Sequence, residues 1–403
     1  MDRCLLRADV EERNAATHRH CRRVAALALE VARASGLPSS LDPVLEQAAL
    51  FHHSLDLARK PKPLDRLALD VLGAEGFDGI SELHMLKGIV AMCNLVDEQI
   101  EALEFEPKEI DEILEEISEF AAFEGFDPCL VDHLRRFHCA DLLCRIESGD
   151  GLPVEARSAQ RVFRALWQER DYEVEELEGV AHRDPVLAGT LVGVANSALY
   201  SPSRKLSSVE QAISYIGTVA ARRVLMAAVL RPLFASSGLR RLWSHSMNSA
   251  HYCSGLAEHT SFLGAGEGLI LGLLHDLGAL AAEFLDRKRG NARARLEEGG
   301  CPSTYTEKLF FGADHGEIGS RILAGWGFPE HLVEAVRYHH QPERSEAPLA
   351  AFLYLAEFWS GVDEDLPSFY RVEHCLARTG LSLESLTQVP PADNAFKALR
   401  SVA

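Results

Sequence analysis

The sequence has no paired cysteine motif. Its nine cysteines are spread singly along the chain, none forms a CxxC pair, and Cys139 and Cys144 are five residues apart. An odd count with irregular spacing argues against both a disulfide framework and a zinc ribbon. We therefore expect reduced thiols that are mostly packed inside the protein.

Basic residues are scarce relative to acidic ones. The chain has 41 Lys and Arg against 60 Asp and Glu, a formal net charge of −19. Nucleic-acid binding needs clustered positive charge, so a nucleic-acid partner is disfavoured. Two groups of basic residues do lie close together in sequence: Arg222, Arg223 and Arg231, and Arg287, Lys288, Arg289, Arg293 and Arg295. We interpret both as solvated helix faces, with a local basic patch as the alternative.

Long apolar runs are missing as well. The longest, Leu349–Ala356, is far too short to cross a bilayer. The first residues, MDRCLLRADVEER, carry charges where a secretory signal has its apolar core. We therefore expect no membrane association and a cytoplasmic location.

The length and composition suit more than one domain. A chain of 403 residues with 47% hydrophobic and 25% charged residues is long enough for two globular domains, each with its own core. The segment ESGDGLPVE, residues 147–155, combines Gly, Pro, Ser and acidic residues and is the best candidate linker. It predicts one domain at 1–151 and another at 155–403.

Helical periodicity marks the region before this linker. Val24, Leu27, Ala28 and Val31 recur at the spacing of one helix face. The strongly acidic segment Glu101–Glu124 has an apolar face too, so we expect an amphipathic helix whose glutamates face solvent.

The stretch LILGLLHDLG, Leu269–Gly278, carries the first candidate site. It reads as a buried apolar helix that ends in an adjacent His275–Asp276 pair. Burying an ionisable pair is costly unless the pair is hydrogen-bonded or binds an ion. Either a structural His–Asp hydrogen bond or a metal site would meet this need.

Further histidines and an acid follow the same order along the chain. The additional candidates are His245, His315, His339, His340 and Glu357. Imidazole and carboxylate groups together suit iron, manganese, zinc or nickel, and such residues on separate helices can converge in a bundle core. With His275 and Asp276 they are seven candidate metal ligands, and the order and the sequence contexts in which they occur make the set specific.

The contexts of these residues resemble a known family. The stretches RDPVLAGTLVGVANSALYS (Arg183–Ser201) and SSVEQAISYIGTVAARRVL (Ser207–Leu225) are followed by LWSHS, GLLHDLG, DHGEIGSRIL, WGFPEHLVEAVRYHHQP and LAEF. In this order they resemble the HDOD branch, a group of bacterial regulatory proteins in the HD superfamily of metal-dependent phosphohydrolases. The resemblance covers roughly 155–361 and implies an all-α fold of helical bundles.

The resemblance also implies roles for single residues. Asp276 would bridge two metal ions and the histidines would divide between them, so one or two divalent transition-metal ions are expected. Glu357 stands where the family usually has an aspartate. The Gly-Tyr-Pro signature of the related HD-GYP phosphodiesterases is absent after His340, which argues against cyclic-di-GMP hydrolysis. Asn196 is expected to cap or cross-link helices.

The N-terminal region shows a weaker HD resemblance. His20 with Arg23 and Val24 resembles the HxxRV opening of an HD domain, and Asp141 resembles its closing aspartate. In AALFHH, however, His53 follows His52 where an aspartate should stand. We expect a degenerate HD-like helical domain, in which His20, His52, His53 and Asp141 either form a mononuclear metal site or remain as remnants in a structural or ligand-sensing domain.

Two functions remain open from the sequence. The first is a bacterial signal-transduction protein that acts by binding a ligand or a protein partner, with a nucleotide or phosphate compound as a candidate ligand. The second is a metal-dependent phosphohydrolase or phosphodiesterase with a mono- or dinuclear His/Asp centre, for which Arg321 and Arg337 are candidate substrate-binding cations.

Overall fold

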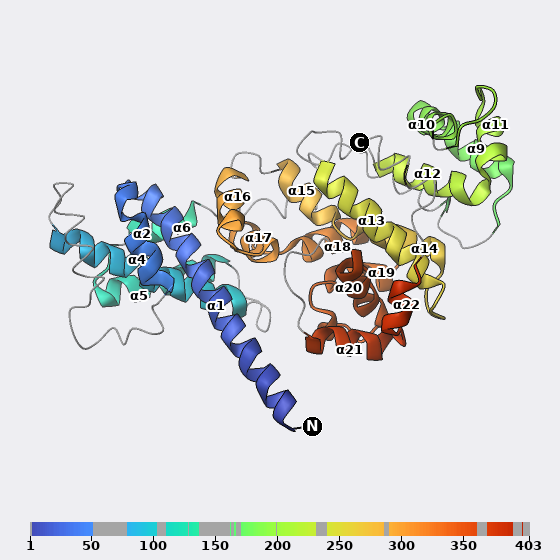
Figure 1. Ribbon diagram of the computed structural model, residues 1–403. Helices are drawn as coiled ribbons and strands as arrows, with labels where there is room; N and C mark the ends of the chain where they lie inside the picture. The colour runs from blue at the N-terminus through green and yellow to red at the C-terminus, as the bar shows by residue number, and fades with distance from the viewer. Residues whose placement is uncertain are drawn as a thin grey trace. The chain divides into compact units, whose positions relative to one another are not determined.

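The protein is all-helical in the part of the chain that the structure describes. The computed structural model describes residues 2–50, 79–102, 110–127, 129–136, 162, 165–166, 171–198, 200–230, 240–285, 290–360, 369–389 and 397. Within these ranges every regular element is a helix (Figure 1). The predicted all-α fold is confirmed.

The chain packs into two compact units. The first comprises Met1–Leu142 and Asp286–Asp314, and the second comprises Leu143–Leu285 and His315–Ala403. Residues 286–314 thus leave the second unit and return to the first. The linker predicted at 147–155 lies outside the described residues, so the domain boundary there stays a prediction.

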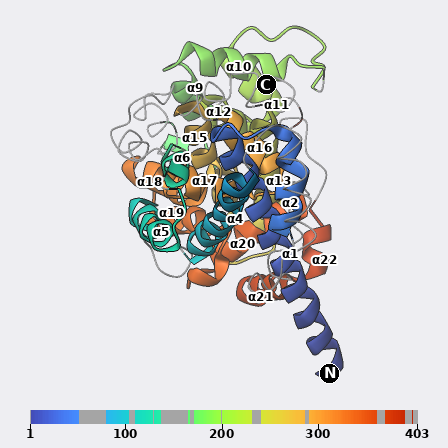
Figure 2. The same ribbon diagram turned by 90° about the vertical axis from the view of Figure 1, so that its left-hand side faces the viewer.

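The first unit is built around one long helix. Its helices are α1 (Asp2–Ala34), α2 (Asp42–Leu50), α4 (Gly79–Ala102), α5 (Ile110–Glu124), α6 (Cys129–Arg135), α16 (Gly290–Glu298) and α17 (Ser303–Phe311), with a 3₁₀ turn at Ser39–Leu41. Both α2 and α4 pack along α1, and α16 joins them (Figures 1 and 2). The predicted apolar face of α1 is buried, with Val24, Leu27 and Ala28 fully enclosed.

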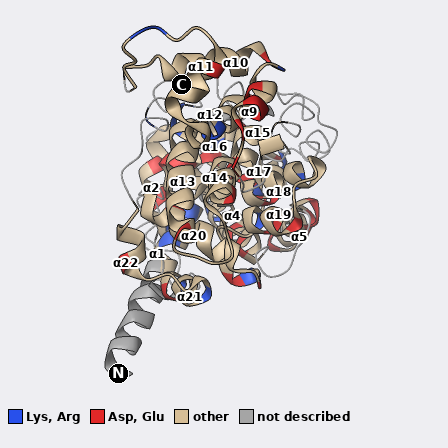
Figure 3. Ribbon diagram, turned by 90° about the vertical axis from the view of Figure 1, so that its right-hand side faces the viewer, with Lys and Arg blue, Asp and Glu red and all other residues tan. Residues whose placement is uncertain are grey.

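Helix α5 has the predicted amphipathic form. Ile113, Leu114 and Ile117 are buried, while Glu115 and Glu119 are exposed. Figure 3 marks the acidic positions of α5 in red. Glu115 pairs with Arg135 of α6 at 2.9 Å. The apolar side of α5 therefore supplies core contacts to the first unit, and its acidic side is solvated.

A buried ionic network joins α1 to α4. Asp97 of α4 is fully buried, and its Oδ1 accepts a hydrogen bond from Arg23 Nε at 2.8 Å. Its Oδ2 accepts one from Arg23 Nη2 at 2.9 Å and lies 2.7 Å from His20 Nδ1. Arg23 also bonds Glu101, and its guanidinium lies 5.3 Å from the centre of the Tyr305 ring on α17. A buried carboxylate needs such partners, because unpaired it would be strongly destabilising.

The second unit contains two groups of helices. The first group is α9 (Val174–Ala181), α10 (Pro185–Ala195), α11 (Val209–Ile216) and α12 (Thr218–Leu230). The second is α13 (Arg240–Ala257), α14 (Ala265–Leu274), α15 (Leu277–Leu285), α18 (His315–Gly325), α19 (Glu330–Arg337), α20 (Pro348–Ser360), α21 (Phe369–Thr379) and α22 (Leu383–Thr387), with a 3₁₀ turn at Pro342–Arg344. Within it α13 packs on α14 and α20, and α15 packs on α18.

Asn196 closes the loop between α10 and α11. Its Nδ2 donates to the carbonyls of Val192 and Leu206, both at 2.9 Å, and its Oδ1 accepts from Leu206 N at 2.8 Å. This is the cross-linking role predicted from the sequence.

Among the residues that the structure describes, one helical stretch, Ala265–Glu283, is long and apolar enough to meet the criteria for a membrane span. Its most apolar window is 78% buried inside the protein. This degree of burial is that of a core helix, and the cytoplasmic location stays a prediction.

Glycines allow the helices of the second group to approach closely. A Cβ on Gly272 of α14 would lie 2.5 Å from Ala250 Cα on α13. A Cβ on Gly278 of α15 would lie 2.6 Å from Gly319 N on α18, and closer still to the carbonyl oxygen of His315. Both neighbours are backbone, which cannot move aside without shifting a helix.

We predict that Gly278→Ala destabilises the protein by about 1 to 3 kcal/mol, because the added methyl group would push α15 away from α18. The shift of the urea unfolding midpoint measures this effect. Gly189→Ala on α10 is the matched control, since a Cβ there meets nothing within 4 Å. The control should be neutral or stabilising by up to about 1 kcal/mol, and equal destabilisation by both variants would contradict the close packing.

The ionic network of the first unit predicts a pH-dependent stability. The hydrogen bond to Asp97 raises the pKa of His20 above its ordinary 6.5, against the effect of burial. Burial would raise the pKa of Asp97, but the hydrogen bonds from His20 and Arg23 lower it, so the carboxylate stays ionised at neutral pH. Because the folded state raises the pKa of His20, its stabilisation is complete below about pH 6.5 and declines at higher pH.

His20→Gln should therefore lower the free energy of unfolding by about 1 to 3 kcal/mol at pH 6 and by less at pH 9. Urea unfolding at both pH values measures the difference, with His84→Gln on α4 as the control for loss of an exposed histidine. The same deficit at both pH values would show that His20 does not act through its charge.

Candidate metal centre

Seven side chains from different parts of the chain meet inside the second unit. His245 lies on α13, His275 and Asp276 lie at the junction of α14 and α15, His315 begins α18, His339 and His340 follow α19, and Glu357 lies on α20. His275 and His339 are completely buried, and Asp276, His315 and Glu357 are less than 8% exposed. The packing brings together all seven residues predicted from the sequence.

The first group consists of His245, His275, Asp276 and Glu357. His275 Nε2 lies 2.8 Å from Glu357 Oε1 and 3.3 Å from Asp276 Oδ1. His245 Nε2 lies 3.1 Å from Asp276 Oδ2 and 2.9 Å from His275 Nε2. Two imidazoles and two carboxylates therefore direct ligand atoms at one small volume.

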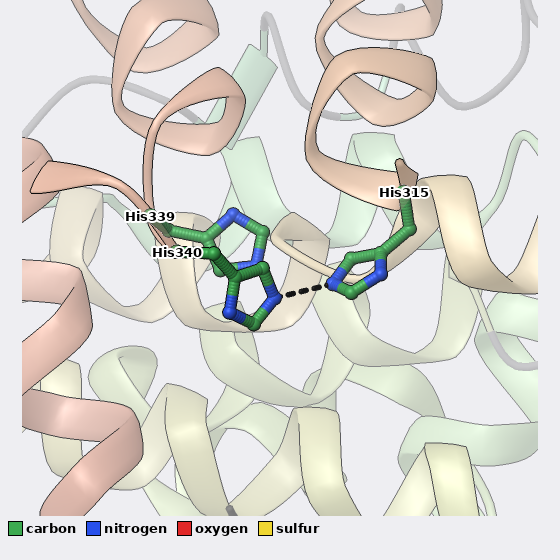
Figure 4. A group of neighbouring side chains, drawn as sticks. All are labelled: His315, His339 and His340. Carbon is green, nitrogen blue, oxygen red and sulfur yellow. Dashed lines mark hydrogen bonds between the residues drawn. The ribbon is translucent and has the colours of Figure 1, made fainter. Parts of the chain in front are cut away.

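The second group consists of His315, His339 and His340. Figure 4 shows His315 approaching from the start of α18 while His339 and His340 approach from beyond the end of α19. His315 Nε2 lies 2.7 Å from His340 Nε2 and 3.4 Å from Asp276 Oδ1. Asp276 is thus shared, because it faces His315 of this group as well as His245 and His275 of the first.

Backbone carbonyls set the orientation of two imidazoles. His275 Nδ1 lies 2.8 Å from Gly272 O, and His339 Nδ1 lies 2.6 Å from Val336 O. A carbonyl oxygen can only accept a hydrogen bond, so each Nδ1 carries the proton and donates it. In both rings Nε2 is the nitrogen directed at the cluster, which is how protein histidines are commonly oriented for metal binding.

The charged groups within the cluster compensate one another. Burial lowers the pKa of His245, but Asp276 and Glu357 more than offset this and raise it to about 9. Burial would raise the pKa of Asp276, yet His275 and His245 hold it well below its usual range. Protons on the histidines and a metal ion are therefore alternative ways to compensate the two carboxylates.

The second group has the opposite tendency. Burial, with a contribution from His339, lowers the pKa of His340 well below 6.5. Burial also lowers the pKa of His339, whose Nε2 is buried and has no hydrogen-bond partner. Neutral imidazoles whose lone pairs point into the cluster can coordinate a metal ion. A buried nitrogen without a partner is destabilising unless it binds such an ion.

The residues present fit a divalent transition metal. Two ligand atoms about 2.1 Å from one ion are about 3.0 to 3.4 Å apart at octahedral or tetrahedral angles. The separations across both groups, from 2.7 to 3.7 Å, bracket that range. Five imidazoles and two carboxylates suit zinc, iron, manganese or nickel.

The N-terminal candidates have a different environment. His20 belongs to the ionic network with Asp97 and Arg23, while His52, His53 and Asp141 lie outside the described residues. His20, Asp97 and Glu101 do have ligand atoms within 4.8 Å of one another. Because the Arg23 guanidinium already bonds both carboxylates, a protein cation balances the charge that a metal would otherwise balance. The mononuclear site stays a prediction.

Asp97, the buried carboxylate that His20 and Arg23 contact, was not among the residues singled out from the sequence. Its one available signal was an acidic side chain at the end of the apolar run in AMCNLVDEQI. Arg321 and Arg337, the substrate-binding cations proposed from the sequence, both lie against the carboxylate of Glu317. Their Nη2 atoms are 3.0 and 3.7 Å from Glu317 Oε1.

One curated relative is an uncharacterized protein of Treponema pallidum (strain Nichols). It is 22% identical over 266 residues, which are 61% of this chain and 51% of the relative. The chain therefore spans about half the length of the curated relative it matches.

Two solved structures share the fold. An HDOD domain protein of unknown function from Geobacter sulfurreducens is 24% identical and matches 65% of this chain and 95% of its own, with a TM-score of 0.51. A protein from Shewanella amazonensis SB2B, whose name proposes phosphohydrolase activity, is 21% identical and matches 66% of this chain and 98% of its own, with a TM-score of 0.51.

A family model supports the resemblance seen in the sequence. The model for the HDOD domain matches residues 152–342, within the 155–361 region predicted apart from three residues at the start. Six of the seven candidate ligands lie in the matched range, and Glu357 follows it. The HD-like character of the N-terminal unit stays a prediction. Together with the shared helical fold, the match shows that this chain carries an HDOD domain at residues 152–342.

Proposed function

We propose that this chain is a bacterial signal-transduction protein whose HDOD domain holds one or two divalent transition-metal ions. The ligands would be His245, His275, Asp276 and Glu357 on one side and His315, His339 and His340 on the other. In this proposal the domain acts by binding a ligand or a protein partner rather than by turnover.

The position of Asp276 carries the proposal. Its Oδ2 lies 3.1 Å from His245 Nε2, while its Oδ1 lies 3.3 Å from His275 Nε2 and 3.4 Å from His315 Nε2. A carboxylate between two groups of imidazoles can serve both groups, and a neutral residue could not. The unpartnered Nε2 of His339 supports the same conclusion.

Burial and the surrounding cations favour regulation over catalysis. Apart from His245 and His340 the cluster is enclosed, and Arg321 and Arg337 face Glu317. A phosphohydrolase needs cationic groups directed at the substrate phosphate beside its metal centre. A closed centre would instead hold α13, α15, α18 and α20 together and make their packing depend on metal.

Metal-dependent phosphoester hydrolysis is the second candidate function. The observation that favours it is the shared Asp276, because paired metal sites in hydrolases use such a carboxylate. A bound metal would supply an activated water and Lewis-acid stabilisation of a phosphate ester. In that case the Gly272 and Val336 carbonyls would hold the Nδ1–H groups of His275 and His339, so that each Nε2 could bind the metal.

We predict that the full chain, purified without chelator, contains one to two transition-metal ions per molecule and that Asp276→Asn loses most of them. The substitution keeps the size of the side chain but removes the charge that serves both groups. Elemental analysis of both proteins measures the effect. His251→Gln on α13, the helix that carries His245, is the matched control and should keep its metal.

A wild-type protein that binds no transition metal, even after incubation with zinc, manganese or iron(II), would contradict the metal proposal. The cluster would then be a structural group of protonated and neutral histidines. Metal retained at the full level by Asp276→Asn would contradict the role given to this carboxylate.

A phosphodiesterase assay separates the two candidate functions. We predict that the metal-loaded protein hydrolyses bis(p-nitrophenyl) phosphate no faster than the metal-free protein does. Metal-dependent turnover that is lost in Asp276→Asn and kept in His251→Gln would instead establish the phosphohydrolase function.

A further inference from the structure

A second polar site lies in the same unit, on the helices that precede the metal centre. A cavity of about 400 Å³ opens between α12 and α14. Its walls are Asp171, Val219, Arg222, Arg223, Met226, Ala265, Gly266 and Leu269. This volume is within the range of small-molecule sites, which commonly form between groups of helices.

Arg222 is held in a defined position at this cavity. Its Nε donates to Leu166 O at 2.7 Å, and its guanidinium lies 5.4 Å from the centre of the Tyr172 ring. A guanidinium fixed on one edge and one face is oriented before a ligand arrives, so less entropy is lost on binding.

Gly266 allows this guanidinium to lie against α14. A Cβ at Gly266 would lie 2.5 Å from Arg222 Nη1 and closer to Nη2. Any side chain at this position would therefore displace the Arg222 guanidinium. Because Gly266 has no side chain, Arg222 can place its positive charge from α12 against the first turn of α14.

The other walls add a second cation and an apolar surface. Arg223 comes from the next position of α12, and its Nη2 lies 3.4 Å from Ser254 Oγ on α13. Val219, Met226 and Leu269 supply apolar contacts, and Asp171 is the one carboxylate of the lining. Two guanidinium groups and one carboxylate give the lining a positive balance, in a chain whose net charge is −19.

From the sequence alone, Arg222 and Arg223 are expected on a solvated helix face. The structure corrects this interpretation, because both side chains are partly buried and line a cavity. Arg231, the third member of that group, lies outside the described residues.

We propose that this cavity binds a small phosphate ester. Arg222 and Arg223 would hold the phosphate oxygens, since guanidinium groups match phosphate in both charge and geometry. Val219, Met226 and Leu269 would contact the organic part, and Asp171 would accept a hydrogen bond from a hydroxyl or amino group of it. The inference rests on the proposed regulatory function and supplies the ligand site which that function needs.

One helix connects the cavity to the candidate metal centre. Helix α14 begins at the cavity with Ala265 and Gly266, and it ends directly before His275. One rigid helix of 10 residues therefore joins the two sites. A phosphate ester bound to Arg222 would compensate the positive charge that lies against the first turn of this helix and so change the packing of α12 on it.

Isothermal titration of the full chain with inorganic pyrophosphate and with adenosine 5′-monophosphate tests the proposal. Pyrophosphate probes the two guanidinium groups alone, and the nucleotide adds an organic part. We expect saturable binding of both, at an affinity at least about tenfold weaker in Arg222→Gln and in Arg223→Gln, because each substitution removes a charge-assisted contact. Gly266→Ala, which keeps both charges, should also weaken binding.

Arg240→Gln at the start of α13 is the control, because it removes one exposed positive charge elsewhere in the unit. Its affinities should equal those of the wild type. Absence of saturable binding of both probes below about 10 mM, or unchanged binding in Arg222→Gln and Arg223→Gln, would overturn the proposal.

Metal content measured on the same samples separates this inference from the proposed function. Weakened probe binding with unchanged metal content supports the cavity as an independent site. Probe binding that disappears in Asp276→Asn but survives in Arg222→Gln and Arg223→Gln would place the phosphate at the metal centre and overturn the inference.

Discussion

The second unit depends on one buried carboxylate. Asp276 lies at the junction of α14 and α15 and faces histidines from α13 and α18, as well as its neighbour His275. A buried charge of this kind is tolerated only with compensating partners, and here every one of those partners belongs to a different turn or helix. The site therefore determines which helices must meet, and the helices in turn bury most of the site.

Small residues make this arrangement sterically possible. Gly278 follows Asp276 by two positions and lets α15 touch the backbone of α18 at Gly319, which brings His315 within reach of Asp276. Gly272 does the same between α14 and α13, and its carbonyl also orients His275. The segment from Gly272 to Gly278 thus sets both the helix contacts and the orientation of the candidate ligands. A substitution that changes one of them is expected to change the other.

The sequence indicated the side chains that meet in the His/Asp/Glu cluster but not those that line the cavity, for a physical reason. His275 and Asp276 stand in a strongly apolar helix, so their burial could be inferred locally, and motif order led to the other ligands. Arg222 and Arg223 have no such context: Arg222 lies against Gly266, more than 40 residues away, and Tyr172, while Arg223 lies against Ser254. Likewise, the role of Asp97 depends on the packing of α1, which places His20 and Arg23 beside it. Helical periodicity could not show that 286–314 packs with the first unit either, because that choice depends on the tertiary partners of α16 and α17.

The return of residues 286–314 to the first unit has a consequence for synthesis on the ribosome. Glu30 of α1 pairs with Arg295 of α16, a partner 265 positions later in the chain. At roughly 5 to 20 residues per second, that partner emerges on the order of 10 to 50 s after α1. The nascent first unit must wait over that interval with the surface meant for α16 and α17 uncovered. Neither unit of this protein can mature before the other has been largely translated, and a chaperone that shields α1 would have most of the elongation time in which to act.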